Sequence, residues 1–232
     1  MYCCYMCCVI SFVNTKGGVG KSFLSTSMAI WLDDQDYRVA LIDADDQKTS
    51  SKWISDIEKH NVEIVTLDEN SEDLRGEELR VRINERKRSL DFVVVDTKGA
   101  AGLTTSAAVI KSDITCIPIQ PSAADIWPLE NALSTVRLSQ EVRQGLPLAF
   151  LVLNQVDHRD VGARQIRNIA SKFEVAVAIT SIKRLRAYRN APGQRMAPTR
   201  LGGRFEFSAL ALEQLFTEIV QSKLNQKKVI NG

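Results

Sequence analysis

Two lysines and a run of glycines stand close together near the start of the chain, in a pattern suited to binding phosphate. The stretch is Lys16-Gly-Gly-Val-Gly-Lys21-Ser22. Glycines let successive backbone N–H groups turn toward one anion, because no Cβ obstructs them. A lysine supplies a point charge for the β- and γ-phosphates of a nucleotide, and a serine hydroxyl is a ligand for Mg²⁺. The stretch therefore predicts a nucleotide site, with Lys21 on the phosphates and Ser22 on the metal.

The residues on either side predict a strand, a phosphate loop and a helix in succession. Val9 to Val13 are apolar or small, which predicts a buried strand, and helical spacing runs from Phe23 to Leu32. A helix that begins at the loop adds the positive end of its dipole to the site. The general phosphate-loop pattern has a glycine five residues before Gly20, where this chain has Thr15.

The pattern Lys-Gly-Gly-x-Gly-Lys-Ser resembles the deviant Walker A box of the ParA/MinD family of ATPases, in which the extra lysine, here Lys16, is the signature. The resemblance extends from about Cys8 to about Leu215. It implies that Mg²⁺-ATP is bound by the loop residues Gly17, Gly18, Val19, Gly20, Lys21, Ser22 and Phe23. It also implies that Lys16 reaches the phosphates of a second subunit, so that ATP closes a homodimer and hydrolysis opens it.

Two more buried strands are predicted to end in a carboxylate, at Asp43 and at Asp96. In an open parallel sheet, ligands bind beyond the carboxyl ends of the strands, so both acids should face the crevice of the phosphate loop. Asp96 fits the acid that holds Mg²⁺. Asp43 is a candidate for orienting the attacking water and for a magnesium ligand; the alternative is a turn residue.

The residues that follow these two strands depart from the family pattern. Asp43-Ala-Asp-Asp-Gln47 resembles the box Asp-x-Asp-Pro-Gln, with Asp46 in place of the proline, and loss of that proline loosens the turn. After Asp96 the family has Thr-Pro-Pro or a small-residue variant, whereas Thr-Lys98-Gly-Ala follows here. Gly99 and Gly102 preserve a flexible, switch-like loop. Lys98 is either a solvated loop lysine or an added contact to phosphate or a partner.

Two later strand ends complete the nucleotide site by resemblance. Gln120-Pro121-Ser122 is similar to the Pro-Ser loop that precedes a long helix in the family, which makes Pro121 a candidate nucleotide contact. Asn154-Gln-Val-Asp157 has the Asn-x-x-Asp form that contacts a purine edge in related folds. Asn154 and Asp157 are therefore candidate adenine contacts.

Strands and helices alternate along the whole chain. Further strands are predicted at 62–67, 113–119, 148–153 and 175–179, and further helices at 49–59, 74–88, 101–111, 128–144, 160–173 and 205–224. Such a series implies right-handed crossovers and a doubly wound, mostly parallel α/β sheet with helices on both faces. We expect one domain over 1–232, with 1–7 as a possible N-terminal extension and 225–232 as a frayed tail.

The basic residues are distributed unevenly along the chain, and this distribution is more informative than the net charge. The net charge of the 232 residues is +2, and 44% hydrophobic with 25% charged residues is ordinary for a globular protein. From residue 183 to residue 204 there are seven basic residues and no acidic one: Lys183, Arg184, Arg186, Arg189, Arg195, Arg200 and Arg204. This composition suits sequence-independent binding to DNA phosphates, which the resemblance also implies for this region. The alternative is a solvated basic helix.

The N-terminus carries Cys3, Cys4, Cys7 and Cys8, whose C-x-x-C spacing would suit a metal site. Cys8 is predicted to begin the first strand, where alternate side chains point to opposite faces, so four thiolates cannot converge on one ion. The uncharged opening lacks a basic region and a small-residue cleavage site, which predicts a cytoplasmic protein. No apolar run is long enough to span a bilayer.

These features favour a homodimeric ATPase that binds DNA non-specifically on the nucleoid and partitions or positions cargo. The resemblance implies slow hydrolysis that a ParB-like or adaptor protein stimulates; the cargo, whether plasmid, chromosome or organelle, stays open. The alternative is a MinD-like, membrane-associated regulator of division, which requires a terminal amphipathic helix. The segment 224–232 has three bulky apolar residues and two lysines, too few for a confident anchor. An iron–sulfur reductase on the same scaffold is disfavoured, because Cys116 has no companion cysteine near it.

Overall fold

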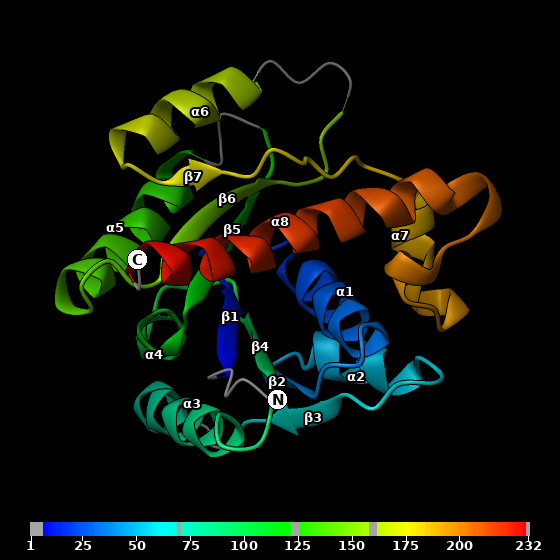
Figure 1. Ribbon diagram of the computed structural model, residues 1–232, viewed down its shortest axis with the longest axis horizontal. Helices are drawn as coiled ribbons and strands as arrows, with labels where there is room; N and C mark the ends of the chain where they lie inside the picture. Colours follow the sequence, from blue (N-terminus) through cyan, green and yellow to red (C-terminus); the bar gives the residue numbers. More distant parts are fainter. Residues whose placement is uncertain (1–6, 69–70, 122–125, 158–161, 231–232) are drawn as a thin grey trace.

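The computed structural model describes residues 7–68, 71–121, 126–157 and 162–230, which form a parallel sheet between two layers of helices (Figure 1). The sheet of the described residues has seven strands in the order β3-β2-β4-β1-β5-β6-β7. The strands are β1 Cys8–Phe12, β2 Val39–Ala44, β3 Glu63–Thr66, β4 Phe92–Thr97, β5 Ile114–Ile119, β6 Leu148–Leu153 and β7 Ala176–Val177. The predicted doubly wound α/β fold is confirmed, and every strand pair is parallel.

Helices follow the strands in the alternating order that the sequence predicts. They are α1 Lys21–Asp34, α2 Thr49–Asp56, α3 Glu72–Arg86, α4 Leu103–Lys111, α5 Ile126–Val142, α6 Gly162–Lys172, α7 Arg186–Asn190 and α8 Glu206–Ile230. Short 3₁₀ turns at Pro192–Gln194, Pro198–Arg200 and Gly203–Phe205 join α7 to α8. Pro128 lies in the first turn of α5, where its missing N–H removes no helical hydrogen bond.

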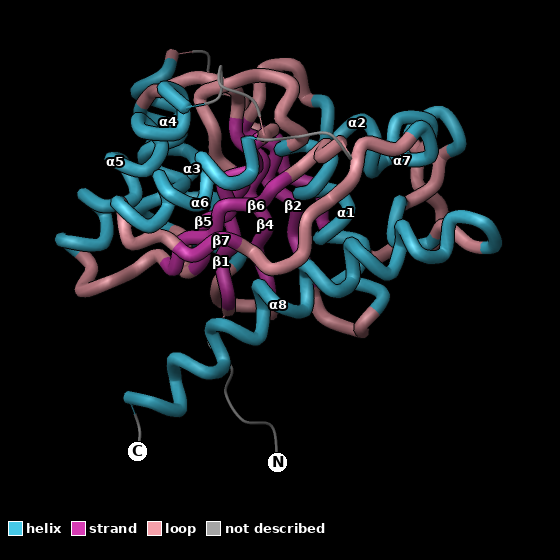
Figure 2. Tube along the Cα trace, turned by 90° about the horizontal axis from the view of Figure 1, so that it is seen from above, coloured by secondary structure: helices cyan, strands magenta, loops and turns pink. Residues whose placement is uncertain are grey.

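Each face of the sheet has its own apolar core, because alternate side chains of a strand point to opposite faces. Ile10 of β1 belongs to the core that α1, α2, α7 and α8 cover, whereas Val9 belongs to the core under α3, α4, α5 and α6. Figure 2 shows the strands between these two layers. Cys7 and Cys8 are buried in the two different cores, as the strand assignment predicts, while Cys3 and Cys4 lie outside the described residues.

Three predicted elements differ most from the structure. The last helix was predicted to end at Leu224; α8 continues to Ile230, and the chain has no proline or glycine between Glu206 and Ile230 that would stop it. Helix α2 ends at Asp56 instead of Lys59, because Ile57 is extended and Lys59 has a φ of 57°. Strand β7 has two residues instead of five. None of the described helices is both long and apolar enough to cross a membrane.

Candidate nucleotide site

The phosphate loop connects β1, at the centre of the sheet, to α1. Gly18 and Gly20 have φ values of 75° and 97°, a region that glycine enters without strain. Gly20 occupies the position before the first helical residue, so α1 starts directly at Lys21. The predicted strand, loop and helix are therefore in place, and the N-terminus of α1 faces the site where its dipole favours an anion.

Side-chain amides from two neighbouring strand ends hold the backbone of this loop. Gln120, after β5, and Gln155, after β6, both donate from Nε2 to the Gly18 carbonyl, at 3.0 and 2.9 Å. Asn154 Nδ2 donates to the Val19 carbonyl at 2.7 Å. The sequence reasoning assigned Asn154 to adenine and overlooked both glutamines as supports of the loop. Their signal was a polar amide immediately after a buried strand, a position that faces the ligand in this fold.

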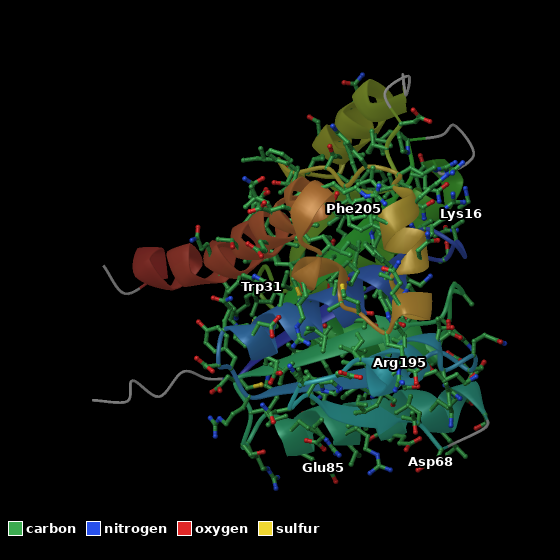
Figure 3. The ribbon with its side chains drawn as sticks, turned by 90° about the vertical axis from the view of Figure 1, so that its right-hand side faces the viewer. Lys16, Trp31, Asp68, Glu85, Arg195 and Phe205 are labelled. Carbon is green, nitrogen blue, oxygen red and sulfur yellow. The ribbon has the colours of Figure 1, made fainter. Side chains whose placement is uncertain are left out.

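The two lysines of the loop are linked by a hydrogen bond from the Lys21 side chain to the Lys16 backbone. Lys21 is 6% exposed, and its Nζ donates to the Lys16 carbonyl at 3.1 Å. Burial lowers the pKa of Lys21, and the carboxylates of Asp96 and Asp45 oppose that fall. Lys16 itself is half-buried, and its N–H donates to Asn14 Oδ1 at 2.9 Å. In Figure 3, Lys16 lies at the outer edge of the molecule, where a second protein could approach it.

The two predicted acids are direct neighbours in the sheet. Asp43 of β2 and Asp96 of β4 are paired residues in adjacent parallel strands, which are about 4.8 Å apart in sheets. Phe12, the last residue of β1, pairs with Asp96 on its other side. The register thus brings the phosphate loop and both carboxylates to one end of the sheet, as the sequence predicts.

Asp96 has the burial and the chemistry of a metal-binding carboxylate. It is completely buried, and neither of its oxygens accepts a hydrogen bond. Burial raises its pKa to about 7; the nearby hydroxyls of Ser22 and Ser50 oppose this rise, and the Asp43 carboxylate adds to it. Leaving a buried carboxylate unpaired is costly unless a ligand compensates it. Asp96, Asp43 and the Ser22 hydroxyl are oxygen ligands of the kind Mg²⁺ prefers.

The donor set also fits magnesium in number. Among the described residues no group of three or more His, Cys, Asp or Glu side chains converges on one point. Mg²⁺ commonly takes one or two carboxylates, with the remaining ligands coming from phosphate and water. The pair Asp43 and Asp96 therefore suits a metal that arrives with a nucleotide.

Asp43 has a structural role in addition to the predicted one. Its Oδ1 accepts the Asp45 N–H at 3.1 Å, and its Oδ2 accepts the N–H of Ser51, in the first turn of α2, at 2.8 Å. Asp45 is half-buried, and its charge acts on Lys21. The sequence reasoning did not include Asp45 among the site residues, although it is the second aspartate of the recognised box.

A cavity of about 430 Å³ adjoins the loop, within the usual size range of small-molecule sites. Gly20, Ser22, Phe23 and Asn154 line it, and the Phe23 ring lies 5.0 Å from that of Tyr188, centroid to centroid. Four predicted nucleotide contacts thus share one cavity. Pro121 is buried and Asp157 is exposed, and neither is among the residues that line it.

The predicted DNA-binding residues separate into groups in the structure. Lys183, Arg184 and Arg189 line the same cavity, so part of the basic segment borders the nucleotide site. Arg200 is bound within the fold: its guanidinium pairs with Asp34 at 2.7 Å and donates to the carbonyls of residues 58 and 59. Arg195 donates to the Asp56 carbonyl at 3.2 Å, and Arg204 lies over the Phe205 ring. Arg186 is exposed.

Substituting Gly20 with alanine should damage the site locally. A Cβ at Gly20 would lie 2.1 Å from Asn154 Nδ2, and the φ of 97° is unfavourable for any L side chain. We expect a loss of about 2–4 kcal/mol in the free energy of unfolding, from strain and overpacking together, and loss of nucleotide binding. Urea unfolding and a fluorescent-nucleotide titration measure the two effects. Gly193→Ala, where a Cβ meets nothing within 4 Å, is the control; equal effects of both substitutions would contradict the prediction.

The fold and the site together define a phosphate-loop nucleotide-binding protein. The chain belongs to the family described as the CobQ/CobB/MinD/ParA nucleotide binding domain, whose model matches residues 10–198. This confirms the family that the two-lysine loop indicates.

Two known relatives match most of the chain. The maintenance of carboxysome distribution protein A of Halothiobacillus neapolitanus is 28% identical over 92% of this chain and 96% of its own length. The sporulation initiation inhibitor protein Soj of Bacillus subtilis is 27% identical over 79% of this chain and 87% of its own length. Among solved structures, an ATP complex of a McdA variant from Cyanothece matches with a TM-score of 0.74 at 16% identity, over 93% of this chain and 97% of that chain. The structural match supports the fold.

Proposed function

We propose that the protein is an ATP-hydrolysing homodimer that binds DNA without sequence preference and positions a cargo along it. The observation that carries the nucleotide part is the juxtaposition of Lys21, Ser22 and two buried acids at adjacent strand ends, one of them without any hydrogen-bond partner. The positioning part is supported by relatives whose names refer to carboxysome distribution and to sporulation control. These relatives fit cargo positioning better than a MinD-like cycle on a membrane, which stays the alternative.

The residues of the chain suggest how phosphate would be held. The backbone of the loop and the Lys21 ammonium bind the phosphates, and Ser22, Asp43 and Asp96 would hold magnesium beside them. Mg²⁺, when bound, neutralises charge that develops on the transferred phosphoryl group. Lys16 of one subunit would contribute a second cation to the nucleotide of the other.

Phosphoryl transfer to water also uses a residue that orients the attacking water, a role that a carboxylate can take. Asp43 was predicted for this role, but both of its oxygens accept backbone N–H groups. Asp45 lies two residues further on, half-buried and near Lys21. Its Oδ1 accepts the Gln47 N–H at 2.9 Å, whereas Asp43 accepts such bonds on both oxygens. We infer that Asp45 shares or takes over this role, while Asp43 fixes the loop and reaches magnesium.

The DNA footprint should be smaller than the seven predicted cations, because Arg200 is bound within the fold. With Mg²⁺-ATP present, Arg186→Gln should reduce the slope of log affinity against log salt by about 0.9 per subunit, the value for one lost phosphate contact. Arg200→Gln should leave this slope unchanged and lower the free energy of unfolding by about 1–3 kcal/mol, because Asp34 loses its partner.

Fluorescence anisotropy of a labelled duplex, measured at several salt concentrations with and without Mg²⁺-ATP, tests this part of the proposal. Binding that needs ATP and falls with salt is expected. DNA binding that does not depend on ATP would contradict the proposal. An unchanged salt slope for Arg186→Gln, with a reduced slope for Arg200→Gln, would assign the DNA contacts to other residues. Sedimentation with anionic liposomes and ATP tests the membrane alternative. The partner protein would be sought as a stimulator of the ATPase.

A further inference from the structure

The N-terminal part of α3 contacts the segments that follow β2 and β4, the strands that carry Asp43 and Asp96. We call Glu72, Arg75 and Gly76 the α3 splint. Arg75 is 6% exposed; its guanidinium donates to the Ala44 carbonyl at 3.0 Å and pairs with Asp46 Oδ1 at 2.6 Å. It therefore contacts the end of β2, one residue after Asp43, and the following turn, one residue after Asp45.

The other two members of the splint hold the loop after β4. Glu72 pairs with Lys98, and its second oxygen accepts the Thr104 N–H, at the start of α4, at 2.8 Å. Gly76 packs so closely on Leu103 that a Cβ would come within 3.2 Å of the Leu103 carbonyl carbon. Of the two roles considered for Lys98, the structure does not show a solvated lysine. Lys98 forms an ion pair with Glu72, which fixes its loop.

This second loop also contacts the phosphate loop. Gly99, one residue after Lys98, lies so near that a Cβ would be 3.0 Å from the Gly17 nitrogen. A shift of the loop after β4 would therefore press directly on the backbone that binds phosphate. Holding Lys98 in place consequently protects the shape of the nucleotide site.

The two ion-paired loop residues, Asp46 and Lys98, stand where the family pattern has a proline or a small residue. The Lys48 N–H donates to the Asp45 carbonyl at 3.0 Å, which makes residues 45–48 a β-turn with Asp46 in its second position. Proline is favoured at that position because its ring presets φ. This chain has Asp46 at that position, and Arg75 of α3 forms an ion pair with it.

We propose that the α3 splint fixes the segments that follow β2 and β4, so that Arg75 and Glu72 are positioning residues for ATP hydrolysis. These segments adjoin the strand residues Asp43 and Asp96 and include Asp45, and neither Arg75 nor Glu72 lines the cavity beside the phosphate loop. The inference deepens the proposed function and rests on it. Arg75 should dominate, because it is nearly buried and contacts two acceptors, whereas the side chains of Glu72 and Lys98 are 30% and 23% exposed.

Steady-state ATPase assays and nucleotide titrations on the full chain test the proposal. Arg75→Ala should lower kcat by about 10- to 100-fold, because a loop displaced by about 1 Å can cost 100-fold in rate, while Mg²⁺-ATP affinity changes less than threefold. Arg75→Lys should recover little, since a single ammonium does not reproduce the fork that joins Ala44 and Asp46. Arg82→Ala is the matched control: Arg82 lies on the same helix and pairs with Asp68 and Glu78, away from both loops.

Rescue separates positioning from simple stabilisation. In the Arg75→Ala background, Asp46→Pro should restore at least half of the lost rate, because the turn regains an internal constraint. If Arg75→Ala does not fold, Asp46→Asn provides the test. The Asp46 side chain is 56% exposed, so this substitution breaks the ion pair without disturbing the core, and it should lower kcat.

The outcomes are distinguishable. If the unmodified protein hydrolyses ATP and both Arg75→Ala and Asp46→Asn match its kcat, the splint inference is overturned and the proposed function stands. A loss that Asp46→Pro does not restore, with equal losses in affinity and in melting temperature, would also overturn it by showing a purely structural role. If the unmodified protein binds but does not hydrolyse ATP, both proposals are overturned.

Discussion

Replacing Lys21 with alanine is expected to weaken Mg²⁺-ATP binding strongly while leaving the protein folded. Lys21 Nζ is 3.1 Å from the Lys16 carbonyl and close to the charges of Asp96 and Asp45, so it already lies within the loop that would surround the phosphates. Truncating one partner of a buried, hydrogen-bonded charge pair costs about 2–5 kcal/mol. The affinity should therefore fall by roughly 30- to 5,000-fold, since 1.4 kcal/mol is a factor of ten.

Without nucleotide, the same substitution should have little effect on stability. Burial lowers the pKa of Lys21, which means that the folded protein holds this ammonium at an energetic cost. The melting temperature of Lys21→Ala should consequently be close to that of the unmodified protein, and the rise that Mg²⁺-ATP produces should disappear. Lys52→Ala, which removes an exposed lysine of α2, should keep this rise. Full ATP affinity in Lys21→Ala would refute the phosphate-loop assignment.

Local patterns predicted the parts of the site that local physics determines. Apolar runs located β1, β2, β4, β5 and β6, and glycines bracketed by lysines located the loop. Because parallel strands place their carboxyl ends together, Asp43 and Asp96 could be assigned to one site before their register was known. Leu148–Leu153 was predicted at both ends, since a buried apolar run there is bounded by Pro147 and Asn154.

The parts that sequence reasoning missed depend on contacts between distant residues. Lys98 is paired with a residue 26 positions earlier, and Arg200 with one 166 positions earlier, so neither pairing leaves a periodic signal. The seven basic residues between 183 and 204 were predicted to form one DNA-binding surface, because a count of charges does not show which way each side chain points. In the fold, Asp34 supplies the missing acid to Arg200 from α1, and the remaining cations divide between the cavity and the surface. The position of Gln120 and Gln155 after buried strands could have indicated the site, but their contact with the Gly18 carbonyl depends on the fold.

Replacing Lys16 with glutamine is expected to abolish ATP-dependent dimerisation or hydrolysis while ATP binding stays within about threefold of normal. The Lys16 backbone is held from two sides, by Asn14 Oδ1 on its N–H and by Lys21 Nζ on its carbonyl, and Gly99 packs against it. The side chain extends from this fixed base at the edge of the molecule (Figure 3). Glutamine keeps the length and polarity of the side chain but removes its charge.

The size of the effect follows from the role proposed for Lys16. A cation supplied by a second subunit at a phosphoryl-transfer site is worth about 10³–10⁵ in rate. We therefore expect ATP turnover to fall by about 10³-fold or more. Light scattering coupled to size-exclusion chromatography, with a non-hydrolysable ATP analogue, should show the unmodified protein as a dimer and Lys16→Gln as a monomer or a catalytically inactive dimer.

Lys172→Gln, in the last turn of α6, removes a charge of the same kind far from the loop and should preserve both dimer and rate. ATP binding and dimerisation are measured separately, so the experiment tests separately whether Lys16 acts on the nucleotide of the other subunit and whether it takes part in dimerisation or hydrolysis. A Lys16→Gln variant that loses ATP binding would assign Lys16 to the nucleotide of its own subunit. A variant that dimerises and turns over ATP at the normal rate would remove Lys16 from the chemistry, and with it the link between nucleotide binding and a stable, DNA-bound dimer.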